Sequence, residues 1–218
     1  MFVGHYGISF AAAAADPTIP LPALMISTQL LDVAWSAFIL AGIEKARLKR
    51  HFTATNDFDL YYLPYSHGLI TAAGWSLLAG LAAFVLLPGN SLFAAALMAG
   101  VCFSHWLLDL IVHVRDLPLV GNRLKVGFGL WNYRILSQAI ELSILIVGAG
   151  IYMTSLDASA AGIWWFTLAL TAILALVQLV SVFGPPPKAI KAFAANALAA
   201  YVLIPAITLA GGKLLTVL

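Results

Sequence analysis

Six stretches of the sequence are long and apolar enough to cross a lipid bilayer, and no other feature constrains the fold more strongly. A helix needs about 20 apolar residues to span the hydrocarbon core, which is about 30 Å thick. Because a backbone N–H or C=O left unpaired in lipid is costly, such stretches cross as α-helices. We therefore expect an all-α, polytopic membrane helix bundle. The expected spans are Leu21 to Ile43, Tyr65 to Leu87, Leu92 to His113, Trp131 to Met153, Gly162 to Phe183 and Ala192 to Ala210.

The composition agrees with a membrane protein and narrows the kinds of site it can contain. Of 218 residues, 62% are hydrophobic and 9% are charged, and the mean hydropathy is +0.98, far from that of a soluble globular domain. The single cysteine, Cys102, excludes an internal disulfide and a Cys-x-x-Cys site, so any metal must be held by histidine and carboxylate groups. A net charge of +2 gives no reason to expect nucleic acid as a partner, whereas membrane lipids are expected partners.

Basic residues are concentrated in alternate connections between the expected spans. By the positive-inside rule these connections are cytoplasmic, so the first, third and fifth spans run inward. The opposite connections, Pro88 to Asn90 and Ser155 to Ala161, contain no Lys or Arg, and Lys213 in the tail is the exception. The basic residues of the cytoplasmic connections are Lys45, Arg47, Lys49 and Arg50, then Arg115, Arg123, Lys125 and Arg134, then Lys188 and Lys191.

The longest cytoplasmic connection, residues 44–63, is expected to begin as a basic helical extension of the first span. It ends in Phe58, Tyr61 and Tyr62, which suit the headgroup layer as an aromatic belt. This connection is long enough to act as a lid.

The first fifteen residues resemble a signal peptide but lack a Lys or Arg ahead of their apolar part. We expect instead a short re-entrant helix that lies beside the first span, with a cytoplasmic amino terminus and a turn at residues 16–22 on the outer side. It carries His5 and Ser9 on one face and places His5 at nearly the depth of Asp32. The chain then forms a single membrane domain with an N-terminal helix (1–16), site-bearing helices (17–153) and a C-terminal helix pair (154–218).

The most unusual polar group lies at the end of the third span, where His105, Asp109 and His113 are spaced four residues apart. In an α-helix a step of four turns the side chain by about 40° and rises about 6 Å, so the three stack on one face. A carboxylate inside an apolar helix is costly unless it is paired or bound to a cation. Two flanking imidazoles suggest a metal.

Other spans carry polar stripes that can face the same interior. These are Gln29, Asp32 and Ser36, then His67, Thr71 and Gly74, then Arg134, Gln138 and Glu141. One interpretation is a set of interhelical hydrogen bonds with one buried ion pair. The other is a metal site, because a divalent cation offsets the desolvation of so many ionisable groups.

Three imidazoles and two carboxylates suffice for one or two metal ions. The candidate ligands are His5, Asp32, His67, His105 and Asp109. Imidazole-rich ligation favours zinc or another late first-row divalent ion over magnesium or calcium. His113, next to Arg115 at the helix end, is either a sixth ligand or solvated, and His51 is expected to be a plain interfacial residue.

These residues resemble a known family. A histidine near the amino terminus, an aspartate in the first long helix, a histidine in Tyr65-Ser66-His67-Gly68-Leu69, and His105-x-x-x-Asp109 are similar to the bacterial inner-membrane metal-dependent hydrolases of the YdjM type. Through the His-x-x-x-Asp helix, that family is distantly similar to the zinc-dependent phospholipase C and nuclease superfamily. The resemblance covers about the first half of the chain and implies the five ligands above, with Glu141 a looser match, and a bacterial inner-membrane location.

The chain also departs from that family. It has Leu30-Leu31-Asp32 where members often have Pro-Asp-x-Asp, and Leu63-Pro64-Tyr65 where they often have His-Arg-Gly. These differences leave the number of metal ions open.

The expected function is that of a zinc-dependent hydrolase acting on a phosphoester of a lipid or lipid-linked substrate, with the site facing the cytoplasmic leaflet. Arg115 or Arg134 would clamp the phosphate, and Glu141 would be a further ligand or the general base. A metal-ion or proton transporter is the first alternative, weakened by the lack of an internal repeat and of Gly or Pro breaks in the site-bearing helices. A non-catalytic scaffold with a structural metal is the second. The oligomeric state is left open.

Overall fold

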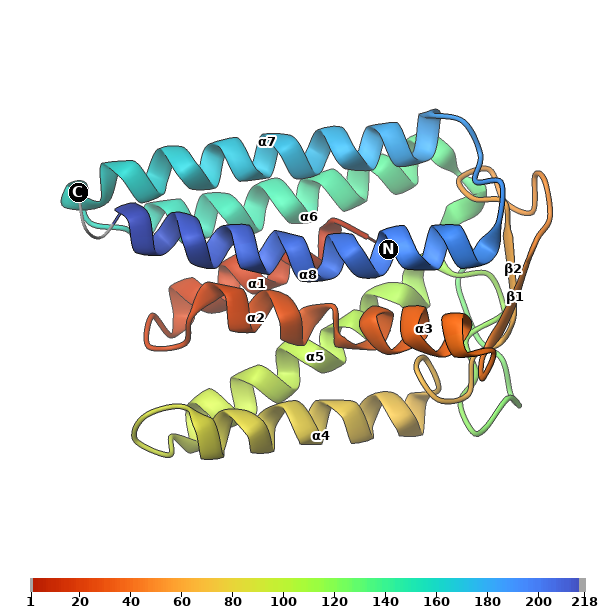
Figure 1. Cartoon of the computed structure of the whole chain (residues 1–218), viewed down its shortest axis with the longest axis horizontal. Coiled ribbons are helices and arrows are strands. Elements are labelled where there is room, and N and C mark those ends of the chain that lie inside the picture. Colours follow the sequence, from red (N-terminus) through yellow and green to blue (C-terminus); the bar gives the residue numbers. More distant parts are fainter. Residues whose placement is uncertain (1, 216–218) are drawn as a thin grey trace.

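Helices form nearly all the regular structure in the computed structural model, which describes residues 2–215 (Figure 1). The helices are α1 (Gly4–Ala15), α2 (Leu21–Thr28), α3 (Leu30–Ala41), α4 (Leu69–Leu86), α5 (Leu92–Val112), α6 (Arg134–Thr154), α7 (Ala161–Phe183) and α8 (Ile190–Leu215). Short 3-10 turns, η1 (Leu130–Asn132) and η2 (Ala158–Ala160), precede α6 and α7, and the strands in this part of the chain are β1 (Lys45–Leu48) and β2 (Phe58–Tyr62). The all-α prediction is confirmed.

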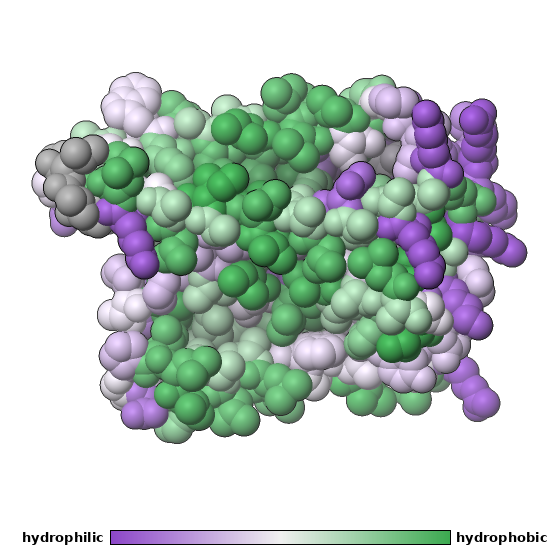
Figure 2. Space-filling view, in the orientation of Figure 1, coloured by the Kyte–Doolittle hydropathy of each residue, from purple (hydrophilic) through white to green (hydrophobic). Residues whose placement is uncertain are grey.

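The bundle has the dimensions and surface of a multi-pass membrane protein. Helices α4 to α8 are each long and apolar enough to cross a membrane, and α2 with α3 is a sixth such segment if the bent pair is counted as one span. Large apolar side chains are exposed on the outer faces, including Leu86 at 79% and Ile135 at 72%. Figure 2 shows apolar side chains over the middle of the molecule, while most strongly hydrophilic ones gather at the end that carries the hairpin.

The first expected span, Leu21 to Ile43, coincides with α2 and α3, but it is bent and is not one continuous helix. Helices α2 and α3 meet at Gln29 with a bend of 53°. In a continuous helix the Thr28 carbonyl would accept the Asp32 N–H. It instead accepts a hydrogen bond from Nδ1 of His105 at 2.7 Å. The break therefore coincides with a long-range contact at the candidate site, and it places Asp32 in the first turn of α3.

The expected helical extension after the first span is wrong, because the chain forms an antiparallel β-hairpin there. Gly42 ends α3 in a left-handed conformation (φ 76°), which glycine adopts without strain. Strands β1 and β2 then pair with Lys45 opposite Tyr62 and Arg47 opposite Asp59. The Arg47 guanidinium donates to Oδ2 of Asp59 at 2.6 and 2.8 Å.

Helix α1 lies inside the bundle against α6, in agreement with the expected short N-terminal helix. Gly7 of α1 and Gly148 of α6 allow the two helix backbones to approach so closely that a Cβ on either glycine would overlap the backbone of the other helix. Val3, Tyr6 and Phe10 are fully buried. This packing positions the one histidine of α1. The predicted cytoplasmic location of the amino-terminal residue concerns residue 1, which lies outside the described residues.

The remaining boundaries differ modestly from expectation. Helix α6 begins at Arg134 and not at Trp131, because Gly129 is left-handed (φ 77°) and residues 130–132 form η1. Helix α8 extends beyond both predicted ends and contains Pro205. Figure 1 shows α4 and α5 at one edge of the bundle, α6 and α7 at the other, and the hairpin across one end.

Candidate metal centre

The last two turns of helix α5 and the residue that follows them supply the centre of the candidate site. His105, Asp109 and His113 are buried, with 0%, 1% and 3% of their surface exposed. Nε2 of His105 lies 3.4 Å from Oδ2 of Asp109, and Nε2 of His113 lies 3.3 Å from the same oxygen. The three side chains therefore stack on one face, as the spacing predicts, and His113 is not solvated.

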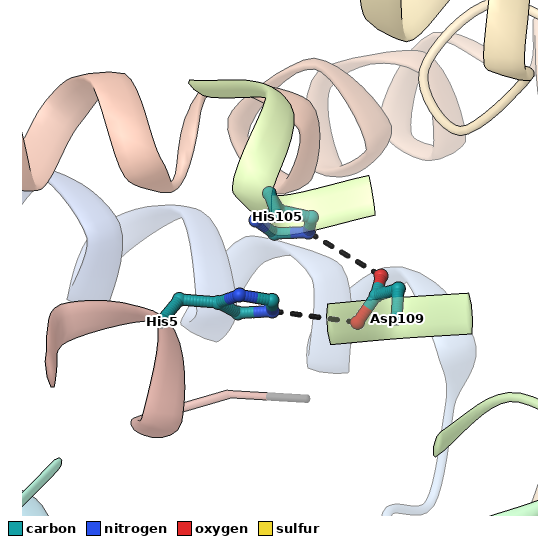
Figure 3. A group of neighbouring side chains, drawn as sticks. All are labelled: His5, His105 and Asp109. Atoms are coloured by element: carbon teal, nitrogen blue, oxygen red, sulfur yellow. Dashed lines mark ion pairs between the residues drawn. The ribbon is translucent and has the colours of Figure 1, made fainter. Parts of the chain in front are cut away.

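Other elements bring further ligand groups to Asp109. His5 of α1 places Nε2 3.3 Å from Oδ1 of Asp109, and its ring stacks on that of His105 with the centroids 3.7 Å apart (Figure 3). His67, two residues before α4, places Nε2 3.4 Å from Oδ2 of Asp109 and 3.4 Å from Oδ1 of Asp32. The structure thus brings all five candidate ligands, and His113, to one place.

The spacing of these atoms fits a metal ion. Donor atoms around a tetrahedral zinc with bonds of about 2.0–2.1 Å lie about 3.3–3.4 Å apart. His67 and His105 lie 3.4 Å from Asp109 Oδ2, and they lie 3.4 and 3.8 Å from Asp32 Oδ1. There are two sets of three donors, and within each set the ligand atoms all lie within 4.8 Å of one another. One set is His5, His105 and Asp109, and the other is Asp32, His67 and His105. These groups could hold a metal ion.

The outward nitrogen of each of three histidines is held by a defined acceptor. Nδ1 of His105 donates to the Thr28 carbonyl, and Nδ1 of His113 lies 2.8 Å from Oδ1 of Asp116. An N–H on Nδ1 leaves a lone pair on Nε2 in the neutral ring. Each of these rings therefore directs an acceptor nitrogen at the Asp109 carboxylate. Histidine ligands of metal sites are commonly oriented by such partners.

The third ring, His67, is held through a serine. Ser66 Oγ donates to Oε2 of Glu44 at 2.5 Å and lies 2.8 Å from Nδ1 of His67. Glu44 is 1% exposed, and its Oε1 accepts the N–H groups of Tyr65 and Ser66 at 2.8 and 2.9 Å. Because the Ser66 proton goes to the carboxylate, Ser66 Oγ accepts from Nδ1, and the Nε2 lone pair of His67 faces the site.

Two of the inward nitrogens, those of His5 and His105, have no hydrogen bond to the described part of the protein. Within residues 2–215, Nε2 of His105 and both ring nitrogens of His5 are buried with no hydrogen bond. A buried polar atom without a partner is costly, and a nitrogen lone pair facing a carboxylate oxygen is repulsive unless a cation lies between them. A metal ion resolves both problems, so the donor set fits one.

Asp32 is fixed from its other side. Its Oδ2 accepts a hydrogen bond from the hydroxyl of Tyr201 on α8 at 2.8 Å, which leaves Oδ1 facing His67 and His105. The Asp32 side chain is 14% exposed, more than Asp109 at 2%, and it lines a cavity.

Glu141 lies in the wall of the same cavity but in neither donor set. Its Oε1 accepts the backbone N–H groups of Phe2 and Gly4, and its Oε2 accepts from Nε2 of Gln178 at 3.1 Å. Glu141 therefore ties the beginning of α1, and with it His5, to α6.

The two arginines expected to clamp a phosphate do not line the cavity. Arg115 and Arg134 are both exposed. Arg134 donates to the Ala54 carbonyl in the hairpin loop, and its guanidinium lies over the ring of Phe183 with 5.8 Å to the centroid. Arg134 therefore anchors the hairpin to α6 and α7.

A cavity of about 280 Å³ adjoins the ligand groups. Its polar end is formed by Asp32, His67, Asp109, His113 and Glu141, and most other lining residues are apolar or neutral. The hairpin and its loop contribute Thr55, Asn56, Phe58 and Leu60, α7 contributes Val177, Gln178, Ser181 and Val182, and α8 contributes Phe193, Asn196, Ala197, Ala200 and Tyr201. The long connection after α3 thus covers the site, the position expected of a lid.

Sequence reasoning did not identify Glu44, Ser66, Asp116 or Tyr201 as supporting residues. Asp116 had a usable signal, since it follows His113 by three residues. Glu44 begins the connection whose basic residues favour a helical extension, and nothing in that pattern links it to His67. Tyr201 lies 169 residues from Asp32, so no local pattern links them.

No protein-family model, no curated protein and no solved structure matches this chain.

Proposed function

We propose that this protein is a metal-dependent hydrolase of the bacterial inner membrane that cleaves a phosphoester in a lipid or lipid-linked substrate. The sequence resemblance to the YdjM-type hydrolases and the phospholipase C and nuclease superfamily motivates this reaction class. The observation that carries it is the cluster of inward-facing Nε2 atoms around Asp109, each 3.3 or 3.4 Å from a carboxylate oxygen. Such a donor set suits zinc better than magnesium or calcium.

Zinc bound there would polarise a phosphoryl oxygen and lower the pKa of a bound water to about 7. His67, His105, Asp32 and Asp109 would hold the ion, and His5 on the other oxygen of Asp109 would hold a second ion or complete the first. Among the described lining residues none is Lys or Arg, so the metal would balance the charge of the phosphate. This replaces the expected clamp by Arg115 or Arg134.

Glu141 is the proposed general base. It is 1% exposed, lies in the cavity wall and belongs to neither donor set, so its Oε2 can take a proton while Gln178 keeps it oriented. Gln138, which accepts from Gln178 at 2.8 Å, extends this polar wall and offers its amide to a substrate oxygen.

The test compares wild type with Asp109→Asn in metal content and in release of phosphate or headgroup from a panel of phospholipids and lipid phosphates. We expect wild type to bind metal and to lose activity with chelator. Asp109→Asn keeps the volume but loses the anionic donor, so metal binding and activity should fall while the protein still folds. Asp16→Asn is the matched control, because Asp16 is buried at the outer turn and its carboxylate accepts from Thr18, far from the donor sets. A metal-loaded wild type that hydrolyses nothing would exclude the hydrolase.

A metal-ion transporter is the second candidate, and the bend of 53° between α2 and α3 beside Asp32 favours it. Interrupted helices at mid-membrane are typical of transporter sites. Against it, fully buried Phe10, Leu24 and Met25 fill the interior on the side of the site away from the hairpin. Ion flux into liposomes by the same purified protein separates the two. The third candidate, a scaffold with a structural metal, predicts that Asp109→Asn fails to fold.

A further inference from the structure

The cavity beside the ligand groups reaches the surface of the bundle between α7 and α8. Ser181 of α7 and Asn196 of α8 both line it, and both are exposed. On α8 the wall between Asn196 and Tyr201 consists of the small side chains Ala197 and Ala200, which leave space between the helices. The polar end of the cavity is thus connected to the outside through the gap between these two helices.

The surface around this opening is apolar. On α7, Val180 is 59% exposed and Phe183 is 51% exposed. On α8, Val202 is 57% exposed and Leu203 is 56% exposed. Side chains of this kind on membrane-spanning helices face lipid. The opening therefore faces the bilayer, and what enters it comes from the lipid phase.

The hairpin covers the opposite, cytoplasmic approach to the cavity. The ring of Phe58 packs on Phe193 of α8 with the centroids 4.5 Å apart, and Leu63 is 1% exposed. Thr55 Oγ1 donates to the Trp131 carbonyl, and Arg134 donates to the Ala54 carbonyl, so the hairpin loop is tied to the start of α6. Direct access from the cytoplasm is thereby restricted, while the side between α7 and α8 remains open.

The opening and the ligand groups lie at the same depth. Ser181 is two residues from the end of α7, Asn196 is six residues from the start of α8, and Asp109 is three residues from the end of α5. With a rise of about 1.5 Å per residue, all three lie within about 10 Å of the helix ends on the side of the bundle where the hairpin lies. This is the depth at which the headgroup and first chain atoms of a cytoplasmic-leaflet lipid lie.

We propose that the gap between α7 and α8 is a lateral opening through which a phosphate-bearing membrane lipid reaches the site. Its anionic headgroup lies at the metal-binding cluster, and its hydrocarbon chain lies along Val177, Val182, Phe193 and Ala197 and continues into the bilayer. Ser181 and Asn196 hydrogen-bond the ester oxygens between the two parts. The fate of the headgroup rests on the proposed hydrolase function, but the binding of the lipid does not.

The test uses phosphatidic acid with a diazirine in one acyl chain, mixed into phosphatidylcholine vesicles that contain the full-length protein. After illumination, adducts are mapped by mass spectrometry. We expect adducts on cavity-lining residues of α7 and α8 and on Trp35, which also lines the cavity. Unlabelled phosphatidic acid should compete for these adducts, whereas added phosphatidylcholine should not.

Ala197→Trp should fill the gap, and Ala195→Trp is its matched control. Ala195 lies on the same helix but is exposed and does not line the cavity. We expect Ala197→Trp to lower the cavity adducts at least tenfold, with metal content unchanged, and Ala195→Trp to leave them unchanged. Adducts confined to lipid-facing positions such as Val180 in wild type, or equal cavity adducts in both variants, would overturn the proposal.

The two proposals fail separately. Cavity adducts without any hydrolysis would remove the hydrolase and leave the lateral opening. Loss of turnover of the membrane-embedded lipid in Ala197→Trp, with turnover retained in Ala195→Trp, is the result expected if both hold. Equal turnover of the embedded lipid by wild type and Ala197→Trp would remove the opening and leave the hydrolase.

Discussion

The link from Glu44 through Ser66 to His67 allows a sharp test of how the site is built. Ser66→Ala removes the hydroxyl oxygen that accepts a hydrogen bond from Nδ1 of His67, with Oγ and Nδ1 2.8 Å apart. Glu44 keeps the two backbone N–H groups at 2.8 and 2.9 Å, so the turn before α4 should persist. A hydrogen bond to a charged network contributes about 1.5–3 kcal/mol. At about 1.4 kcal/mol per tenfold change, metal affinity should fall roughly 10- to 100-fold, the range found for supporting residues of metal ligands.

Metal affinity would be measured on the purified protein by competition with a chromophoric chelator. Ser76→Ala is the matched control, because Ser76 is a buried serine of α4 whose hydroxyl donates to the Ala72 carbonyl and has no link to the site. Glu44→Gln adds a second arm. The new glutamine amide can donate to Ser66 Oγ, which turns the serine proton toward Nδ1 of His67. The ring proton then moves to Nε2, so metal affinity should fall at least as far as in Ser66→Ala. Unchanged affinity in Ser66→Ala, with a loss in His67→Ala, would refute the relay.

Two further predictions concern packing and topology. Gly148→Ala places a methyl group against the backbone of Gly7, so it should lower the free energy of unfolding by about 1–3 kcal/mol and reduce metal content. Gly150→Ala, with open space around it, should change neither quantity. Thermal unfolding and metal analysis measure the two effects. Lys49→Cys in the hairpin region should be labelled by an impermeant thiol reagent only from the cytoplasmic side, since the one native cysteine, Cys102, is buried; labelling from outside would invert the orientation.

The sequence predicts the spans well because hydropathy alone determines which segments can lie in lipid. It does not predict the break at Gln29, since no glycine or proline lies there and the break coincides with a hydrogen bond from His105 to Thr28, 77 residues away. The hairpin was missed for a different reason. A basic run after an apolar helix suits a helical extension equally well, and only the left-handed Gly42 ends α3 at that point.

The same distinction applies to the site. His5, Asp32, His67, His105 and Asp109 were predictable as one group because ionisable residues in apolar spans are costly and must share partners. Ser66 and Glu44 were not, since a serine and a glutamate at a membrane boundary are unremarkable until the fold brings them to Nδ1 of His67. The clamp by Arg134 was not predictable in this sense, because its hydrogen bond to the Ala54 carbonyl in the hairpin loop sets its direction, and Arg115 is exposed.

The position of the ligand groups within their elements bears on whether the metal is catalytic or structural. Asp32 lies in the first turn of α3, His67 precedes α4 and His113 follows the last residue of α5, so several donors lie at helix ends and not between packed helix centres. Thr28, Ser66, Asp116 and Tyr201 each contact a donor residue on the side that faces away from the cluster. The α4 to α5 and α1 to α6 contacts are close glycine-mediated packing at Gly80, Gly7 and Gly148, none of which involves a ligand. We expect a site whose donors are oriented by such hydrogen bonds to keep its geometry when metal is removed, as a catalytic centre requires. A structural metal, whose binding energy is folding energy, predicts the opposite.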